Sequence, residues 1–572
     1  MSVFVNAMDT SANKHTFTEK GQLSFTKDGL GDDLLALYFK LVRGADRKYI
    51  CDTMNQIAAD PSKIENLIVL VFQTRDIRGG KGERELFYWM FLELYSNCSR
   101  ELMLPLLSLI PKYGSYKDLN LLWEIVGNEI HGPRPALLAT LRKDIIDLYT
   151  LHLMTDETLL DNSNFDSIGP IKLTLTAKWA PRESGHFCDM AREIARNYYK
   201  REVGSSKKIY TKYRKLVSRL NRELNTTEIH MAGKTWQDIE PGAVSSRCLM
   251  INRDAFQNKI HAKQNEGEQR SSEMDRIICA KNFKEHLESG KTVHGAALHP
   301  NEIIKRYKTD KLDPVLEAQW SDILFSYRSI ISDKIAQGEE VRNIIPVIDV
   351  SGSMTCCSGS VAPIDAAVGL GILLAQLGRG ALKNRAITFS ECPEWIDIGT
   401  GTTLQEKIVS TKNASWGMTT NLYSVFSLIL KIAVKNKLPE YELSNMDIII
   451  LSDMQFDASQ NKSSHWKTTL KNIAIMYKEA GYTAIPHIVF WNLNGGTVDF
   501  PEQSNTRNVT MVSGFSPSAA KTLLTEGIGA VKKEKKTPMD TLHEILEDER
   551  YTDIRNIYRT YVINVSRGLS RF

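Results

Sequence analysis

Long apolar runs, paired cysteines and an excess of either charge are all scarce in this sequence. The apolar stretch VGLGILLAQLG at residues 368–378 stops far short of the ~20 residues that cross a bilayer. The opening MSVFVNAMDT lacks the basic region followed by an apolar region that marks a signal peptide. We therefore expect a soluble, intracellular, cytoplasmic protein without a membrane partner.

The eight cysteines form no CxxC pair, and most lie in apolar segments, where cysteine acts as a small hydrophobic residue. A reducing compartment is the expectation. The 72 Lys and Arg against 68 Asp and Glu leave a formal charge of only +4. This balance excludes a protein that is basic over its whole surface, so any surface that binds nucleic acid must be local.

Strand-like alternation is nearly absent from residue 32 to residue 324. Apolar residues recur there at i, i+3 and i+4, in segments such as DDLLALYFKLVRG and SYKDLNLLWEIVGN that are separated by short breaks of Gly, Pro, Asn or Ser. Successive amphipathic helices with short turns predict an α-solenoid of HEAT-like helical repeats, although no fixed sequence period is present. The predicted helical-repeat domain covers residues 1–335.

The pattern changes near residue 337. Apolar strands such as NIIPVIDV, MDIIILSD and TAIPHIVFWNL then alternate with helical segments. This alternation predicts a mainly parallel sheet that is covered by helices on both faces, in a second domain of residues 336–572. The fold class is therefore α plus α/β. Ligands of such sheets bind beyond the carboxyl ends of the strands, where Asp349 and Asp453 fall.

The stretch NIIPVIDVSGSM allows three interpretations. A serine nucleophile would need the GxSxG elbow, which DVSGSM does not match, and no histidine lies nearby in sequence. A phosphorylated Asp349 would need a second aspartate two residues later as acid and base, but Ser351 stands there. The third interpretation is a divalent metal site.

The metal interpretation rests on residue types and spacing. Asp349, Ser351 and Ser353 alternate after a strand, and Gly352 lets the backbone bend around a point between them. Carboxylate and hydroxyl oxygens are hard ligands, which suits Mg²⁺ or another divalent cation. Further ligands are expected from neighbouring strand ends.

The order of Asp349, Ser351 and Ser353, then Thr420, then Asp453 resembles the metal-ion-dependent adhesion site of von Willebrand factor A domains. The resemblance implies a Rossmann-like A domain and a Mg²⁺ site made of these five residues. It implies a binding site and not a catalyst, since the under-neutralised ion can accept a carboxylate from an acidic protein ligand.

Two alternatives remain open within this resemblance. Thr420 takes the threonine role because it precedes Asn421, and Thr419 is the substitute. The metal can also serve only to brace the domain.

A helical-repeat domain followed by an A domain is similar to the Ro autoantigen and its TROVE relatives, in which a ring of helical repeats binds small noncoding or misfolded RNA. A finer resemblance is to a family of plant, fungal and giant-virus proteins that contain a domain of unknown function. It is carried by GQLSFTKDG, RDIRGGKGERELFYWMFLEL, AKWAPRE, HGAALHPNEII, DVSGSM, LSDMQF and VFWNLN, which run from residue 21 to past residue 494. The Ro resemblance implies RNA as a partner by analogy of architecture.

The segment REIARNYYKREVGSSKKIYTKYRKLVSRLNR, residues 192–222, supports RNA independently. It holds eleven Lys and Arg against two Glu, with tyrosines interleaved. Basic side chains neutralise phosphates and tyrosines stack on unpaired bases. The alternative is a solvated helix face whose tyrosines reach the core. The candidate RNA-binding residues are Arg196, Lys200, Arg201, Lys207, Lys208, Tyr210, Lys212, Tyr213, Arg214, Lys215, Arg219 and Arg222.

The segment TRDIRGGKGER, residues 74–84, resembles a phosphate loop but lacks the GxxxxGK[ST] spacing. It predicts either part of a positive rim or a turn whose glycines adopt positive φ. No convincing acid and base pair is present, so we expect no enzymatic activity. The sequence predicts an RNA-binding or ribonucleoprotein scaffold protein with a Mg²⁺-dependent A domain. The alternative is a protein interaction scaffold whose metal site captures an acidic partner without RNA.

Overall fold

The structure is a computed structural model of the chain. It describes residues 14–129, 134–166, 172–201, 205–260, 269–307, 312–338, 341–355, 362–389, 392–399, 403–413, 420–457, 469–497, 499–526 and 536–569.

The chain forms two compact units that are both discontinuous in sequence. Unit 1 contains residues 1–90 and 292–552, and unit 2 contains residues 91–291 and 553–572. The predicted division at residue 335 follows the change in sequence pattern. By contacts, the first ninety residues and residues 292–335 group instead with the sheet.

Unit 1 is built around a six-stranded sheet in the order β5-β4-β3-β6-β7-β8. Its strands are β3 (Asn343–Ile348), β4 (Arg385–Thr388), β5 (Trp395–Asp397), β6 (Met446–Ser452), β7 (His487–Asn492) and β8 (Val509–Ser513). All neighbours pair in parallel except β4 and β5, which are antiparallel. The expectation of a mainly parallel sheet in the carboxyl-terminal part is confirmed.

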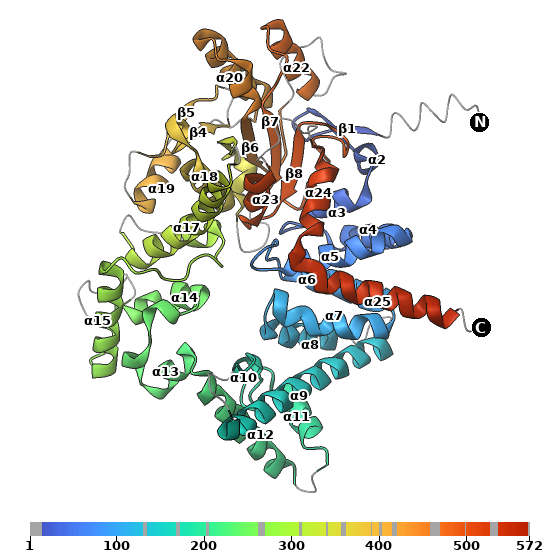
Figure 1. Cartoon of the computed structure of the whole chain (residues 1–572), viewed down its shortest axis with the longest axis vertical. Helices are drawn as coiled ribbons and strands as arrows, with labels where there is room; N and C mark the ends of the chain where they lie inside the picture. Colours follow the sequence, from blue (N-terminus) through green and yellow to red (C-terminus); the bar gives the residue numbers. More distant parts are fainter. Residues whose placement is uncertain are drawn as a thin grey trace. The chain divides into compact units, whose positions relative to one another are not determined.

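Helices surround this sheet in Figure 1. They are α2 (Lys27–Leu30), α3 (Asp33–Lys40), α4 (Arg47–Ala58), α5 (Ile64–Arg75), α16 (Pro300–Ile304), α17 (Pro314–Ala336), α18 (Pro363–Leu377), α19 (Leu404–Asn413), α20 (Leu422–Asn436), α21 (Glu440–Ser444), α22 (Thr469–Glu479), α23 (Ser518–Glu526) and α24 (Pro538–Glu547). Helix α18 packs against β3, β4 and β6, while α3 and α24 pack against β8. Strands β6 and β8 are buried along their whole length because helices cover them.

The amino-terminal residues join unit 1 through backbone and side-chain bonds that the sequence pattern did not show. Phe25, in the hairpin of β1 (His15–Phe17) and β2 (Leu23–Phe25), exchanges two backbone hydrogen bonds of 2.9 Å with Phe500. The side-chain amide of Asn492 donates to the backbone carbonyl of Phe39 at 3.0 Å. Helix α3 is buried at nearly every position, so it requires a partner surface, and β8 supplies it.

Unit 2 is helical in its described residues. Its helices are α7 (Arg100–Tyr113), α8 (Tyr116–Glu129), α9 (Pro135–Asp166), α10 (Thr176–Trp179), α11 (Cys188–Tyr198), α12 (Ser206–Leu224), α13 (Thr227–Gly233), α14 (Ser246–Phe256), α15 (Met274–Glu288) and α25 (Thr552–Leu569), and α6 (Glu85–Asn97) crosses from unit 1. Consecutive helices pack on one another, as α8 does on α9 and α11 on α12. The expectation of a helical region before the sheet is confirmed.

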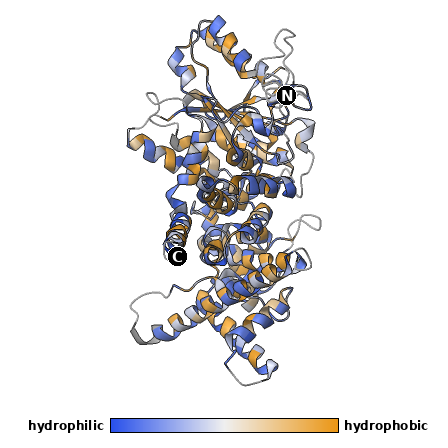
Figure 2. Cartoon of the chain, turned by 90° about the vertical axis from the view of Figure 1, so that its right-hand side faces the viewer, coloured by the Kyte–Doolittle hydropathy of each residue, from blue (hydrophilic) through white to orange (hydrophobic). Residues whose placement is uncertain are grey.

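Hydrophobic and hydrophilic residues are mixed along the helices in Figure 2. None of the helices in the described part of the chain is long and apolar enough to span a membrane. This mixture is typical of helices that pack one face on a core and turn the other to water.

Candidate metal site

The carboxyl ends of β3 and β6 bring Asp349 and Asp453 to the same edge of the sheet. The two strands pair in parallel with Ile348 opposite Leu451. The amide of Asp349 donates to the carbonyl of Leu451 at 3.1 Å, which continues the ladder by one residue. Because each aspartate directly follows its strand, the two carboxylates lie at adjacent strand ends, as the sequence predicted.

Asp349 is fully buried and its carboxylate accepts two hydrogen bonds. The amide of Ser351 donates to Oδ1 at 2.9 Å, and the hydroxyl of Ser452 donates to Oδ2 at 2.6 Å. Burial, together with the negative charge of Asp453, raises the pKa of Asp349 to about 6. A site that raises the pKa of a carboxyl in this way favours a bound positive charge.

The predicted serine ligands follow Asp349 in the bend that the sequence indicated. The hydroxyl oxygens of Ser351 and Ser353 lie 3.1 Å apart, which is hydrogen-bond distance. The short helical turn Gly352–Thr355 begins between them. Open space faces the position of a Cβ at Gly352, so this glycine is not required by crowding.

Asp453 has the least satisfied carboxylate of the site. Its Oδ1 accepts a hydrogen bond of 3.2 Å from the amide of Gln455. Its Oδ2 is buried and has no hydrogen-bond partner among the described residues. Met454, which lies between Asp453 and Gln455 in the sequence, adopts φ of 67°, a left-handed conformation that is uncommon for a residue with a side chain. A buried carboxylate oxygen without a donor is costly, and a bound cation would satisfy it.

Thr420 is held against the segment that follows β6. Its amide donates to the carboxylate of Asp457, and its hydroxyl donates to the carbonyl of Gln455 at 2.6 Å. Asn421 caps α20 by accepting a hydrogen bond from the amide of Ser424 at 3.2 Å. Thr420 therefore lies next to the loop of Asp453, as its predicted role requires. The substitute, Thr419, lies outside the described residues.

These five side chains fit a divalent cation by their chemistry. Two carboxylates and three hydroxyls supply only oxygen ligands, which suit Mg²⁺. In the described residues no three or more His, Cys, Asp or Glu side chains gather in a group that could hold a metal ion. Such a group does not include serine or threonine hydroxyls. Since the candidate site has only two aspartates, hydroxyls and water would fill most of the positions around an ion. The residues that would hold the ion are Asp349, Ser351, Ser353, Thr420 and Asp453.

Lys20 is a neighbour of this site that the sequence patterns did not indicate. It lies in the turn between β1 and β2, and its ammonium group donates to the hydroxyl of Thr420 at 3.1 Å. The turn is anchored to the loop after β6, since the hydroxyl of Thr18 donates to the carbonyl of Phe456 at 2.7 Å. No spacing signal connects residues 400 positions apart, so only the structure places Lys20 here.

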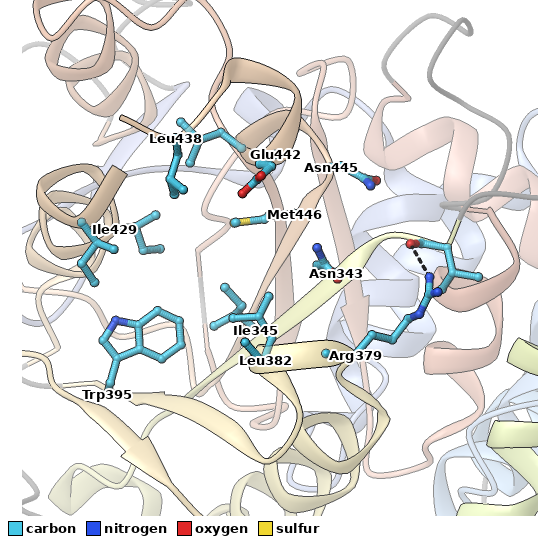
Figure 3. Close-up of a pocket in the computed structure, with 15 residues that line it drawn as sticks. Asn343, Ile345, Arg379, Leu382, Trp395, Ile429, Leu438, Glu442, Asn445 and Met446 are labelled. Atoms are coloured by element: carbon cyan, nitrogen blue, oxygen red, sulfur yellow. Dashed lines mark hydrogen bonds between the residues drawn. The ribbon is translucent and has the colours of Figure 1, made fainter. Parts of the chain in front are cut away.

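A cavity of about 600 Å³ lies at the opposite end of the sheet (Figure 3). It is lined near the amino ends of β3 and β6 by Asn343 and Met446, with Trp395 on one side and Glu442 on another. Because Asp349 and Asp453 follow the carboxyl ends of the same strands, this cavity is separate from the metal site.

Helices α11 and α12 of unit 2, together with the turn that follows α11, carry the predicted RNA-binding residues. Among the residues that the structure describes, Lys207, Lys208 and Lys215 on α12 are exposed and form no ion pair. Lys200, Arg201 and Arg222 are also exposed. These six side chains supply local positive charge, as the sequence indicated.

Other predicted RNA-binding residues are engaged within the unit. Tyr213 is 1% exposed and its hydroxyl donates to the carbonyl of Pro181, so its ring is not available to stack on a base. The interpretation that tyrosines of this segment reach the core is correct for this residue. Arg214 and Arg219 form ion pairs with Glu183 and Asp161.

The remaining candidates, Arg196, Tyr210 and Lys212, contact side chains of the same segment. The guanidinium of Arg196 donates to the hydroxyl of Tyr210 at 2.9 Å. The ammonium of Lys212 lies 5.6 Å from the ring centre of Tyr199. These contacts are compatible with a solvated surface, because the basic groups face half-exposed rings.

The GGKG segment forms a turn in which the lysine is buried. Lys81 is 2% exposed and donates to the carbonyls of Tyr38 and Leu41 at 2.7 and 3.2 Å. Gly82 has φ of 69°, which agrees with the predicted turn. Asp76, which is fully buried, is paired with the guanidinium of Arg550 at the base of the turn. Of the two alternatives for this segment, the turn is the one that the structure shows, and burial removes Lys81 from a positive rim.

Comparisons with known proteins match both parts of the chain. A model described as "Domain of unknown function (DUF7788)" matches residues 343–560, and one described as "Domain of unknown function (DUF2828)" matches residues 134–329. The first match begins at β3 and contains all five candidate metal ligands. The second contains α11 and α12.

The chain is also similar to "Uncharacterized protein L728" of Acanthamoeba polyphaga mimivirus. The two sequences are 26% identical over 536 residues, which cover 93% of this chain and 87% of the viral protein. No solved structure matches the chain. The similarity therefore extends over both the helical part and the sheet part of this chain.

Proposed function

We propose that unit 1 contains a von Willebrand A-like domain that binds a partner through a divalent cation. The cation is held by Asp349, Ser351, Ser353, Thr420 and Asp453, and Mg²⁺ is the ion that this oxygen set favours. The observation that carries the proposal is the buried Oδ2 of Asp453, which has no donor in the described residues and lies one strand away from the buried Asp349 carboxylate.

The ligand of the ion is an acidic side chain of another protein. Two carboxylates at most neutralise the charge of a divalent cation, and hydroxyls add no negative charge. A cation coordinated mostly by hydroxyls and water attracts a further anionic oxygen. The proposal assigns no reaction to the site.

The experiment is binding of the full chain to immobilised peptides that carry a single Glu or the isosteric Gln. In Mg²⁺ we expect binding to some Glu peptides and not to their Gln counterparts, with loss of binding in EDTA. The Asp453→Ala variant should lose the same peptides. Equal binding in Mg²⁺ and EDTA, or by wild type and Asp453→Ala, would contradict the proposal.

A second function is carried by a separate observation in unit 2. Three unpaired exposed lysines on one helix, with Lys200, Arg201 and Arg222 nearby, favour binding of an RNA backbone. We therefore propose that unit 2 is a HEAT-like solenoid that binds RNA, in a ribonucleoprotein scaffold similar to the Ro autoantigen. Without this activity, the protein is an interaction scaffold that acts through its metal site alone.

A further inference from the structure

The turn between β1 and β2 places an ammonium group beside the candidate metal site. Lys20 donates to Oγ1 of Thr420 at 3.1 Å. The Lys20 side chain is half-buried, whereas Thr420 is fully buried. A positive charge from residue 20 thus touches an oxygen that a metal ion needs.

The hydrogen bonds at Thr420 leave little capacity on that oxygen. A hydroxyl has one proton and two lone pairs. The hydroxyl proton of Thr420 is donated to the carbonyl of Gln455 at 2.6 Å, and one lone pair of the hydroxyl oxygen accepts a hydrogen bond from the ammonium group of Lys20. A metal ion would have to share the same small oxygen with this ammonium. Two positive charges that contact the same oxygen repel each other strongly where water is scarce. The ammonium group and the metal ion therefore do not bind this oxygen at the same time.

The turn is anchored independently of Lys20. The amide of Glu19 donates to the side chain of Gln455 at 2.9 Å, and Gly21 forms a backbone bridge with Asp457. The hydroxyl of Thr18 bonds to Phe456. These bonds hold the backbone of the turn on the loop after β6. The Lys20 side chain can therefore leave the site by rotating while the turn stays in place.

We propose that Lys20 is a tethered cation that competes with the divalent ion for Thr420 and so sets the affinity of the site for metal. The inference rests on the proposed metal site and adds its regulation. In the absence of metal, the ammonium supplies part of the positive charge that Asp349 and Asp453 favour. Metal binding requires Lys20 to turn away from Thr420.

The test is a calorimetric titration of the full chain with MnCl₂. Lys20→Ala and Lys20→Gln should each bind Mn²⁺ at least tenfold more tightly than wild type, because both remove the competing charge. Lys20→Arg keeps the charge and should stay within threefold of wild type. Lys14→Ala is the matched control, since Lys14 is an exposed lysine in the same segment. It should leave the affinity unchanged.

The outcomes separate this inference from the site itself. Equal affinity of wild type and Lys20→Ala, with binding abolished in Asp453→Ala, would overturn the role of Lys20 and leave the metal site standing. Tighter binding by Lys14→Ala to the same degree would also overturn it, because the effect would then be one of general charge. Absence of Mn²⁺ binding by wild type and all Lys20 variants would overturn both the site and its regulation.

Discussion

The hydroxyl of Ser452, the last residue of β6, donates a hydrogen bond of 2.6 Å to the carboxylate of Asp349, which follows the neighbouring strand β3. The bond ties the two strand ends that carry the candidate metal ligands. It also orients Oδ2 of Asp349 within the buried edge of the sheet. The site is therefore organised by the chain itself before any ion arrives.

Asp349→Asn is expected to stabilise the metal-free protein above neutral pH. The pKa of Asp349 is raised to about 6 from its ordinary value of 3.8 by burial and by Asp453. The folded state thus holds the proton more tightly than the unfolded state. The stability from this group is complete below pH 3.8 and is lost as the pH rises through 6.

The loss corresponds to about 3 kcal/mol, which the neutral asparagine avoids. Urea unfolding in EDTA at pH 5 and at pH 8 checks this. The variant should gain stability over wild type mainly at pH 8. A variant that is less stable than wild type at both pH values would show that the charged carboxylate of Asp349 does not destabilise the folded protein. With Mg²⁺ added, only the wild type should be stabilised further.

Thr420→Val is expected to weaken metal binding at least tenfold, whereas Thr420→Ser retains it. Valine keeps the shape of threonine but has no oxygen for an ion, and serine keeps the oxygen. Calorimetric Mg²⁺ titration of the two variants makes the comparison. Valine and serine variants with the same affinity as wild type would remove Thr420 from the ligand set.

Lys40→Met is expected to stabilise the protein at neutral pH. Lys40 is 2% exposed, and its ammonium has no hydrogen-bond partner among the described residues. Burial lowers the pKa of Lys40 to about 7, although Asp499 opposes the shift. A lysine with a lowered pKa destabilises the folded state at pH values where the unfolded chain is protonated.

The predicted gain is roughly 3 to 5 kcal/mol at pH 7, and it should shrink as the pH rises toward 10. Denaturant unfolding at several pH values measures it, with Lys48→Met, an exposed lysine of α4, as the control. A gain that does not depend on pH would come from hydrophobic packing and not from the buried charge.

Replacing Lys207, Lys208 and Lys215 by Glu is expected to weaken binding of an RNA with single-stranded ends at least tenfold. If the three lysines contact phosphates, the log-log salt dependence of residual binding should fall by roughly 2. The control replaces Lys281, Lys284 and Lys291, which are exposed in the same unit, by Glu with the same change in charge. Equal RNA affinity of the two triple variants in a filter assay would exclude α12 as the RNA-binding surface.

The mainly parallel sheet and the strand ends that carry the two aspartates could be predicted, because β3 and β6 are continuous apolar runs that end in aspartate, whereas the order of the strands comes from the structure. The burial of Lys40 and Lys81 could not be predicted, since the local sequence pattern is that of an ordinary helix at Lys40 and of a basic loop at Lys81. Their burial comes from packing on β8 and from carbonyls far along the chain.

The positions of Lys20 and Tyr213 were also not predictable from the local sequence pattern. Lys20 meets Thr420 only because the short β1–β2 hairpin, which has three residues in each strand, pairs with the carboxyl-terminal half of the chain. Tyr213 lies in a strongly basic helix, but it falls on the buried face with Leu216 and Val217. Charge patterns locate a surface, whereas helical phase decides which side chains belong to it.

The proposed metal site is tested by counting the divalent ions that each chain binds. Titration of the full, metal-free chain with MnCl₂, followed by the free Mn²⁺ signal in electron paramagnetic resonance, counts the ions. We expect one ion per wild-type chain, displaced by excess Mg²⁺, and none at this site in the Asp349→Ala and Asp453→Ala variants, which should remain folded. Full occupancy in either variant, or no bound ion in the wild type, would contradict the metal site.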